Sequence, residues 1–229
     1  MSPIMRSAQL ALRLPERGGK RRGAGRKPKG PRAQVSHKVR PRFAKPSAAH
    51  VTLRVRRLVW NLRSRRCFRL SEQSLENARE RSGLRVIEFT VLGNHLHLLV
   101  EADSDASLSR GMQGLTIRIA KALNGLMSQR GAVFADHYHS RLLPTPTQVV
   151  KALAYVLGNY AHHFGGAPGS DPFSSGAYGA STRRRVLSVP IGWLLRVGWR
   201  RARSVPEWLP TSAHGDGTDD FPQPGPSTC

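Results

Sequence analysis

The stretch Leu92-Gly93-Asn94-His95-Leu96-His97-Leu98-Leu99-Val100 alternates between polar and apolar side chains and guides the interpretation of the whole chain. A period of two is typical of a β-strand, in which successive side chains point to opposite faces. His95 and His97 would therefore project from one face of the strand, while Leu96, Leu98 and Val100 would point from the opposite face into a core. Two imidazoles side by side on a strand can hold a divalent metal or polarise a phosphate.

The chain is strongly basic, and its charge points to a polyanionic partner. Its 229 residues carry a formal net charge of +23 and have a sequence pI near 11.6, which indicates nucleic acid or an anionic membrane surface. No run of about 18 apolar residues is present, which excludes a transmembrane span. The short apolar stretch near the N-terminus is interrupted by Arg13 and does not read as a secretion signal. We therefore expect a cytoplasmic protein.

Composition divides the chain into three parts. Residues 1–50 contain 14 Lys and Arg against one acidic residue, so that 1–49 is predicted to be a disordered basic arm. Residues 50–164 contain the periodic segments and are predicted to form one catalytic domain. Residues 165–229 are rich in Gly, Pro and Ser and are expected to be mostly disordered, with a short amphipathic segment near 190–203. The two cysteines favour neither a disulfide nor a thiolate site, so any metal would have histidine and oxygen ligands.

The periodic segments predict the order strand, helix, strand, strand, helix, strand, helix. Thr145-Pro146-Thr147-Gln148 combines a cap, a first-turn proline and a glutamine that begin the last helix. This order predicts an α+β, ferredoxin-like βαββαβ antiparallel sheet with two helices on one face and an added C-terminal helix. The predicted elements are a strand over 51–56 running toward Trp60, a helix from Ser71 to Gly83, strands over 84–92 and 95–100, a helix over 108–126, a strand over 132–143 and a helix to 164.

The last predicted helix carries a second group of candidate site residues. Lys151, Tyr155 and Asn159 are spaced by four and lie on a different face from its apolar stripe. A tyrosine phenol beside a two-histidine metal site can attack a phosphodiester, because the metal polarises the phosphate and eases loss of the phenol proton. Tyr155 is therefore the candidate nucleophile.

Three stretches in this order resemble the single-tyrosine HUH transposases of bacterial insertion sequences, especially the REP-associated tyrosine transposases. The resemblance covers about residues 50 to 164. The stretches are Leu92-Gly93-Asn94-His95-Leu96-His97-Leu98-Leu99-Val100, Gly131-Ala132-Val133-Phe134-Ala135-Asp136-His137-Tyr138-His139 and Ala154-Tyr155-Val156-Leu157-Gly158-Asn159.

The resemblance implies a role for each site residue. His95 and His97 would bind Mg²⁺ or Mn²⁺, and Asn159 lies where relatives carry an amide that completes the site. Tyr155 matches the nucleophile that cuts single-stranded, hairpin-flanked DNA, leaving a 5′-phosphotyrosine and a free 3′-hydroxyl, so that strand transfer can follow without ATP. One departure is that this chain has Asn159-Tyr160 where many relatives have Asn-Pro. The resemblance also implies a bacterial, nucleoid-associated protein without a membrane partner. Whether the protein acts as a monomer or as a homodimer stays open.

Other residues compete for these roles. His137 and His139 could join the first pair in a four-histidine zinc site, but the ferredoxin-like strand order separates the two pairs by about 10 Å. Tyr138 and Tyr160 are rival nucleophiles that we interpret as structural. We interpret His162 and His163 as polar residues near the C-terminus of the last helix, where a partial positive charge is favoured.

We expect DNA to contact a positive surface that continues from the basic arm onto the domain. Two other functions are open: a non-catalytic, domesticated nucleic-acid-binding protein, which needs no tyrosine, and a metal-dependent phosphoesterase that uses water. The predicted DNA contacts are Arg54, Arg56, Arg57, Lys151, His139 and Arg141.

Overall fold

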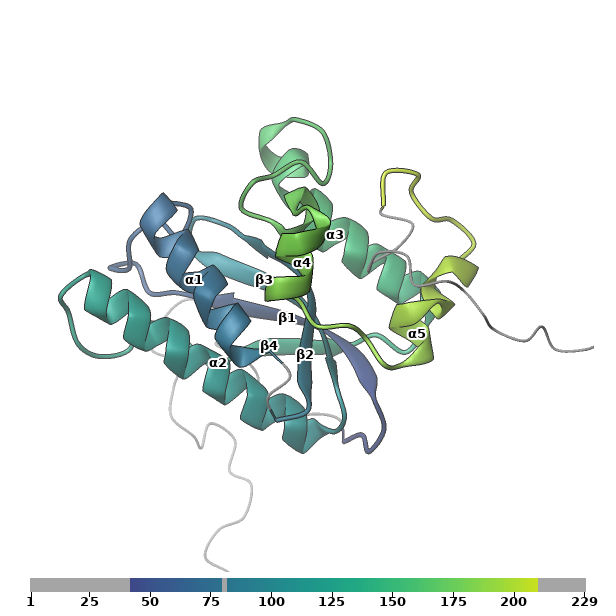
Figure 1. The fold of residues 1–229 in the computed structure, drawn as a ribbon, viewed down its shortest axis with the longest axis horizontal. Coiled ribbons are helices and arrows are strands. Elements are labelled where there is room, and N and C mark those ends of the chain that lie inside the picture. The colour runs from purple at the N-terminus through teal and green to yellow at the C-terminus, as the bar shows by residue number, and fades with distance from the viewer. Residues whose placement is uncertain (1–41, 80–81, 210–229) are drawn as a thin grey trace, which may run out of the picture. The chain divides into compact units, whose positions relative to one another are not determined.

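A computed structural model describes residues 42–79 and 82–209, which contain a four-stranded antiparallel sheet (Figure 1). The strand order is β2-β3-β1-β4, so the first strand lies between the third and fourth, as the ferredoxin-like arrangement requires. The predicted α+β fold class and its order of elements are confirmed. The strands are β1 (Ser47–Arg54), β2 (Leu84–Val91), β3 (His95–Ala102) and β4 (His139–Leu142).

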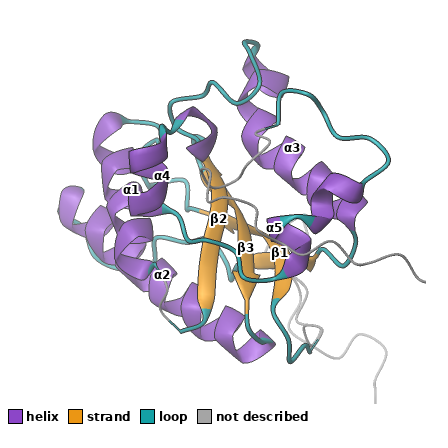
Figure 2. Ribbon diagram, turned by 45° about the vertical axis from the view of Figure 1, so that its right-hand side comes forward, coloured by secondary structure: helices purple, strands orange, loops and turns teal. Residues whose placement is uncertain are grey.

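Helices cover both faces of the sheet. α1 (Arg65–Ala78) and α2 (Asp105–Leu126) pack on one face, and α3 (Pro146–Phe164) lies on the other (Figure 2). Leu96 and Leu98 join the core beneath α1 and α2, whereas Leu99 joins a second core beneath α3. The predicted alternation of β3 is therefore correct, and it turns the histidines toward α3.

The predicted start signals of α3 are present in the structure. The Thr145 hydroxyl accepts the backbone N–H of Gln148 at 3.4 Å, and Pro146 occupies the first turn, where no intrahelical N–H bond is lost. Val149 and Val156 are fully buried against the sheet. This apolar stripe fixes the rotation of the helix and thereby the direction of its other face.

Two predicted boundaries on the first half of the chain are wrong. β1 starts at Ser47 and ends at Arg54 rather than continuing toward Trp60. Its regular pairing with β3 ends there, because Arg54 lies opposite His95, the first residue of β3. The first helix starts at Arg65 rather than Ser71. Ser64 caps it by accepting the N–H of Cys67, while the Ser71 hydroxyl lies inside the helix and donates to the carbonyl of Cys67.

The fourth strand is shorter than predicted. Regular pairing covers only His139–Leu142, and Phe134 forms an isolated bridge with Val55. Between these two stretches the chain turns, and the Asp136 carboxylate accepts the backbone N–H of His137 at 2.7 Å. The turn interrupts the ladder that the apolar residues 132–134 suggested.

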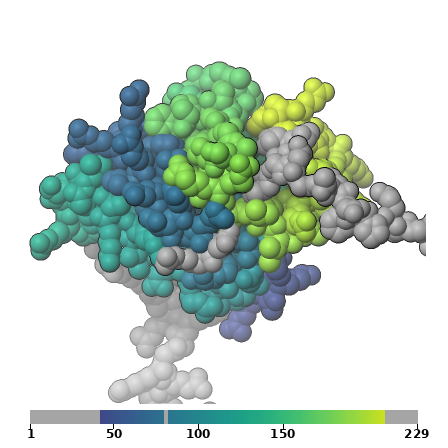
Figure 3. All heavy atoms as spheres, viewed as in Figure 1, coloured from purple at the N-terminus to yellow at the C-terminus, as the bar shows by residue number. Residues whose placement is uncertain are grey.

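The prediction that residues 165–229 are mostly disordered is wrong for residues 165–209. This segment forms ordered turns and short helices, including two within the predicted amphipathic segment near 190–203. Residues 175–187 lie directly beside α1 in the space-filling view (Figure 3). Residues 1–41 of the predicted basic arm (1–49) and the tail beyond 209 lie outside the described residues, whereas residues 47–49 of that arm belong to β1. The short helices are η1 (Ser175–Ala177), α4 (Ala180–Val186), α5 (Trp193–Arg196) and η2 (Gly198–Arg201).

Two buried carboxylates attach this segment to the sheet. Glu88 on β2 is fully buried and accepts hydrogen bonds from Ser175 and the Arg183 guanidinium. Glu101 on β3 accepts the backbone N–H groups of Ile191 and Gly192, each at 2.8 Å. Burying a carboxylate costs free energy unless it has hydrogen-bond or charge partners. Residues 165–209, which composition predicted to be disordered, provide such partners for both carboxylates.

Replacing Arg183 by methionine is expected to lower the free energy of unfolding by about 3–5 kcal/mol, because it leaves Glu88 buried without its cation. Urea denaturation measures the change. Arg184→Met removes a neighbouring exposed cation and should cost no more than about 0.5 kcal/mol. Equal effects of the two substitutions would show that the buried pair does not hold the segment.

Within the described residues, no helix is both long enough and apolar enough to span a membrane.

Candidate active site on the α3 face of the sheet

His95 and His97 project from β3 into the layer between the sheet and α3. Their ring centroids are 4.8 Å apart, with the rings perpendicular. His97 is 4% exposed, and His95 is more accessible at the start of the strand. The strand alternation thus produces the adjacent imidazole pair that the sequence predicts.

Hydrogen bonds orient both imidazole rings by the same nitrogen. His95 Nδ1 lies 2.7 Å from the amide oxygen of Asn94, which can only accept, so the ring donates from Nδ1. His97 Nδ1 lies 3.1 Å from the Thr52 hydroxyl and 3.2 Å from His50 Nε2. In each ring these contacts direct Nε2 away from the strand backbone and leave it for a ligand.

Tyr155 on α3 reaches across to this histidine pair. Its hydroxyl lies 3.5 Å from His97 Nε2, and the two rings meet edge to face with centroids 5.0 Å apart. The ring also lies 5.5 Å from that of His50. Tyr155 is 45% exposed, so its hydroxyl lies at the boundary between the site and solvent, where a large substrate could reach it.

Burial and neighbouring cations keep these imidazoles neutral. Burial, together with the nearby His95 and His50, lowers the pKa of His97 to about 3. Burial also lowers the pKa of His95, helped by Arg54 and His163. A neutral imidazole has a free lone pair, so His95 and His97 are in the state that binds a metal at neutral pH.

Asn159 lies one turn after Tyr155 and faces inward. It is 2% exposed, and neither its amide oxygen nor its amide nitrogen has a hydrogen-bond partner among the described residues. A buried amide without a partner costs free energy. An oxygen in this state fits a ligand for a hard divalent cation. Over residues 42–79 and 82–209, no three His, Cys, Asp or Glu side chains gather as a metal cluster.

Three of the predicted DNA contacts share a sheet face with the histidines. Arg54 lies opposite His95 in the strand register, and Thr52, itself opposite His97, also pairs with His139. Arg141 lies opposite His50, and its charge lowers the pKa of that residue. The exposed side chains of Arg54, His139 and Arg141 therefore form a basic floor beside the site.

The other predicted DNA contacts are placed differently. Arg56 and Arg57 are exposed and follow the end of β1, so they lie outside the strand pairs that contain His95 and His97. Lys151 is exposed one turn before Tyr155 on α3. The structure thus brings Lys151 near the candidate nucleophile along the helix, but it does not bring the two arginines onto the floor of the site.

The competing residues lie elsewhere. Tyr138 is buried in the core beneath α1 and α2, on the opposite side of the sheet. Strand β1 separates His139 from β3, as predicted. His163 lies in the last turn of α3, as predicted, but it also lines a cleft together with His95, whose pKa is lowered by burial, Arg54 and His163.

His50 and Thr52 are site residues that the sequence analysis missed. Both contact His97 Nδ1 and come from β1, 47 and 45 residues earlier in the chain, respectively. The alternation Val51-Thr52-Leu53 already placed Thr52 on the polar face of the predicted strand over 51–56, whereas His50 lies one residue before that predicted strand. Nothing in that pattern states which residues of another strand lie opposite, and this register decides their role.

The chain matches no protein-family model and no curated protein sequence. A solved structure of a REP-associated tyrosine transposase bound to a REP hairpin aligns with it at a TM-score of 0.51 and 13% identity. The alignment covers 62% of this chain and 82% of that one. This chain has the fold of that transposase. A candidate transposase from Deinococcus radiodurans R1 aligns at 12% identity over 59% of this chain and 100% of that one, with a TM-score of 0.37.

Proposed function

We propose that this protein is a tyrosine transposase that nicks single-stranded DNA next to a hairpin and transfers the cut strand. The observation that carries the proposal is the position of the Tyr155 hydroxyl, 3.5 Å from His97 Nε2 within one chain. Tyrosine and histidine come from separate elements, α3 and β3, and a protein that only bound nucleic acid would need neither. The fold shared with a transposase supports the same reading.

The proposed site would hold Mg²⁺ or Mn²⁺ through His95, His97 and Asn159. The donor set fits, because two neutral imidazoles present Nε2 and a buried amide oxygen has no hydrogen-bond partner in the part of the chain that the structure describes. When bound, the cation would polarise the scissile phosphate and stabilise the negative charge that develops on it. Hydrogen bonds between Nδ1 of each ring and the neighbouring residues would hold both rings in place.

Tyr155 would perform the covalent step. Its phenolic oxygen forms a bond to the phosphorus, and the bond from phosphorus to the 3′ oxygen breaks. The proton lost by the phenol is matched by the proton that the departing 3′ oxygen gains. The products are a 5′-phosphotyrosine and a free 3′-hydroxyl. Because the phosphodiester energy is retained in the tyrosine ester, a second hydroxyl can displace the tyrosine and join the strands without ATP.

The surroundings of Tyr155 suit a polyanionic strand. Arg54, His139 and Arg141 lie on the same sheet face as the histidines, and Lys151 precedes the tyrosine by one turn. These side chains would neutralise phosphates on either side of the cut, with the strong salt dependence that such contacts produce. Since Tyr155 contacts the histidine of its own chain, we propose a site completed within one subunit, whether the protein is a monomer or a homodimer.

Covalent capture of DNA tests the proposed activity. The full-length protein is incubated with Mn²⁺ and a 5′- or 3′-labelled single-stranded oligonucleotide that carries a hairpin, and the products are separated on a denaturing gel. The expected result is a protein-linked band for the label on the 3′ side of the cut and a shorter free strand for the other label. Cleavage without the linked band would instead identify a phosphoesterase that uses water. Binding without cleavage would identify a non-catalytic DNA-binding protein.

His50 is expected to act as a positioning residue for the metal ligand His97. His50→Phe keeps a ring of similar size but removes the nitrogen that lies 3.2 Å from His97 Nδ1, so Mn²⁺ should bind about 10-fold more weakly. Electron paramagnetic resonance of free Mn²⁺ measures the affinity without turnover. The matched control is His137→Phe, an exposed ring in the turn before β4. If the two variants bind Mn²⁺ equally well, His50 does not orient the ligand.

A further inference from the structure

A cleft of about 820 Å³ opens beside His95, between the turn that joins β2 to β3 and the end of α3. Its lining includes the polar side chains of Asn61 and Asn94 and the aromatic rings of Tyr160 and Phe164. His95 lines this cleft and also belongs to the histidine pair. A DNA strand whose phosphate lies at the histidine pair would therefore lie next to this cleft.

Planar groups form a stack along the aromatic side of the cleft. The Arg63 guanidinium lies over the rings of Phe173, at 4.3 Å, and Tyr160, at 3.9 Å. Tyr160 also stacks with Phe164, with centroids 4.8 Å apart and an interplanar angle of 28°.

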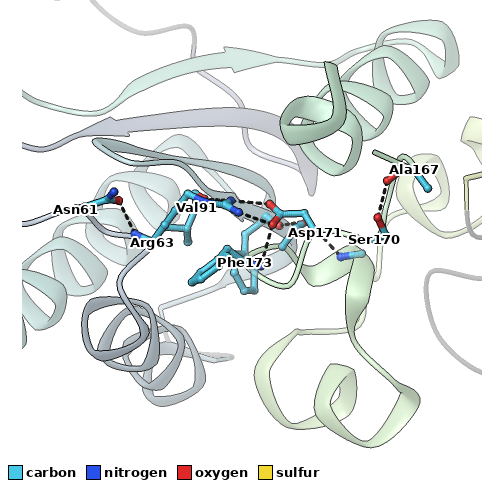
Figure 4. A network of polar contacts seen from close by, with 10 residues as sticks. Asn61, Arg63, Val91, Ala167, Ser170, Asp171 and Phe173 are labelled. Atoms are coloured by element: carbon cyan, nitrogen blue, oxygen red, sulfur yellow. Dashed lines mark hydrogen bonds and ion pairs between the residues drawn. The ribbon is translucent and has the colours of Figure 1, made fainter. Parts of the chain in front are cut away.

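The guanidinium at the centre of the stack is held rigidly and its charge is neutralised. Both terminal nitrogens of Arg63 donate to the carboxylate of Asp171 at 2.8 Å, and one also donates to the carbonyl of Val91 at 3.1 Å (Figure 4). Asp171 is almost fully buried. A bidentate pair of this kind fixes the plane of the guanidinium. Arg63 is thus a support for Tyr160 rather than a free cation for a phosphate.

The outer end of the stack is exposed. Phe164 is 69% exposed although it is the last residue of α3 and lines the cleft. An exposed ring that lines a cleft and is stacked on a supported neighbour can accept one more planar group. The side-chain amides of the same cleft can hydrogen-bond to the edge of such a group, as amides do with unpaired bases.

We propose that this cleft binds an unpaired base of the DNA strand, stacked on Phe164, next to the phosphate that Tyr155 attacks. The proposal rests on the proposed function for its substrate, single-stranded DNA. Stacking on an aromatic ring suits an unpaired base of any sequence, because every base has a flat apolar face. A base inside a duplex is covered on both faces by its neighbours and could not enter, so this cleft selects the unpaired strand beside the hairpin.

A binding experiment that varies the ring and the base together tests this proposal. Fluorescence anisotropy measures the affinity for two labelled hairpin oligonucleotides, one with an unpaired thymidine flank and one with an abasic flank of equal length and charge. EDTA prevents turnover. With the thymidine flank, Phe164→Ala should bind about 10-fold more weakly than the wild type. With the abasic flank, the two proteins should bind equally. Phe164→Trp should retain the wild-type affinity for the thymidine flank.

The control variant is Ile117→Ala, which removes an exposed apolar side chain from α2 on the opposite face of the sheet and should change neither affinity. The proposal is overturned if Phe164→Ala binds the thymidine flank as tightly as the wild type, or if its loss is equal for both flanks. These outcomes are independent of covalent capture. A wild type that forms no protein-DNA link would refute the transposase activity, whereas capture together with an unchanged Phe164→Ala affinity would refute the base site alone.

Discussion

Tyr155→Phe is expected to reduce covalent capture of hairpin-bearing DNA by about 10³-fold or more, the scale on which loss of a nucleophile acts. The substitution removes only the hydroxyl that lies 3.5 Å from His97 Nε2 and leaves the ring in its contacts with His97 and His50. DNA affinity and thermal stability should therefore stay close to the wild-type values. The denaturing gel measures capture, and fluorescence anisotropy measures affinity on the same oligonucleotide.

Tyr138→Phe is the matched control for this variant. Tyr138 is buried beneath α1 and α2, on the other side of the sheet from the histidines, so its hydroxyl should make no difference to capture. A wild-type level of the protein-DNA link in Tyr155→Phe would exclude Tyr155 as the nucleophile. Loss of the link in Tyr138→Phe alone would identify the rival tyrosine instead.

The parts of this molecule that could be predicted are those coded by local periodicity. Alternation alone placed His95 and His97 on one face of β3, and the cap at Thr145 with the stripe through Val149 set both the start and the rotation of α3. Given the ferredoxin-like order of strands, these two local signals place Tyr155 and the histidines on the same side of the sheet.

The parts that could not be predicted depend on contacts between distant residues. His50 contacts His97 only because of the register between β1 and β3, which no short pattern specifies. The segment after residue 165 is ordered because Glu88 and Glu101 are buried in the sheet and need partners. The Gly-, Pro- and Ser-rich composition of this segment does not show that it provides partners for these two carboxylates, so composition alone predicted disorder.

His95→Phe is expected to weaken Mn²⁺ binding by more than about 100-fold and to remove covalent capture with it, because it deletes one of the proposed nitrogen ligands. His95 is the better position to test than His97. Its Nδ1 contacts the adjacent Asn94, whereas His97 Nδ1 contacts both Thr52 and His50, two half-buried residues whose polar groups a substitution would leave without that partner. Mn²⁺ paramagnetic resonance and the capture gel give the two readouts.

Removing the metal from the wild type separates its role from that of the tyrosine. If the cation polarises the phosphate, EDTA should abolish capture, and added Mn²⁺ should restore it in the wild type and in His137→Phe but not in His95→Phe. Capture that continues in EDTA would contradict the metal site while leaving Tyr155 as nucleophile. His95→Phe would then lose activity only through the shape of the site, and its Mn²⁺ affinity would equal that of the wild type.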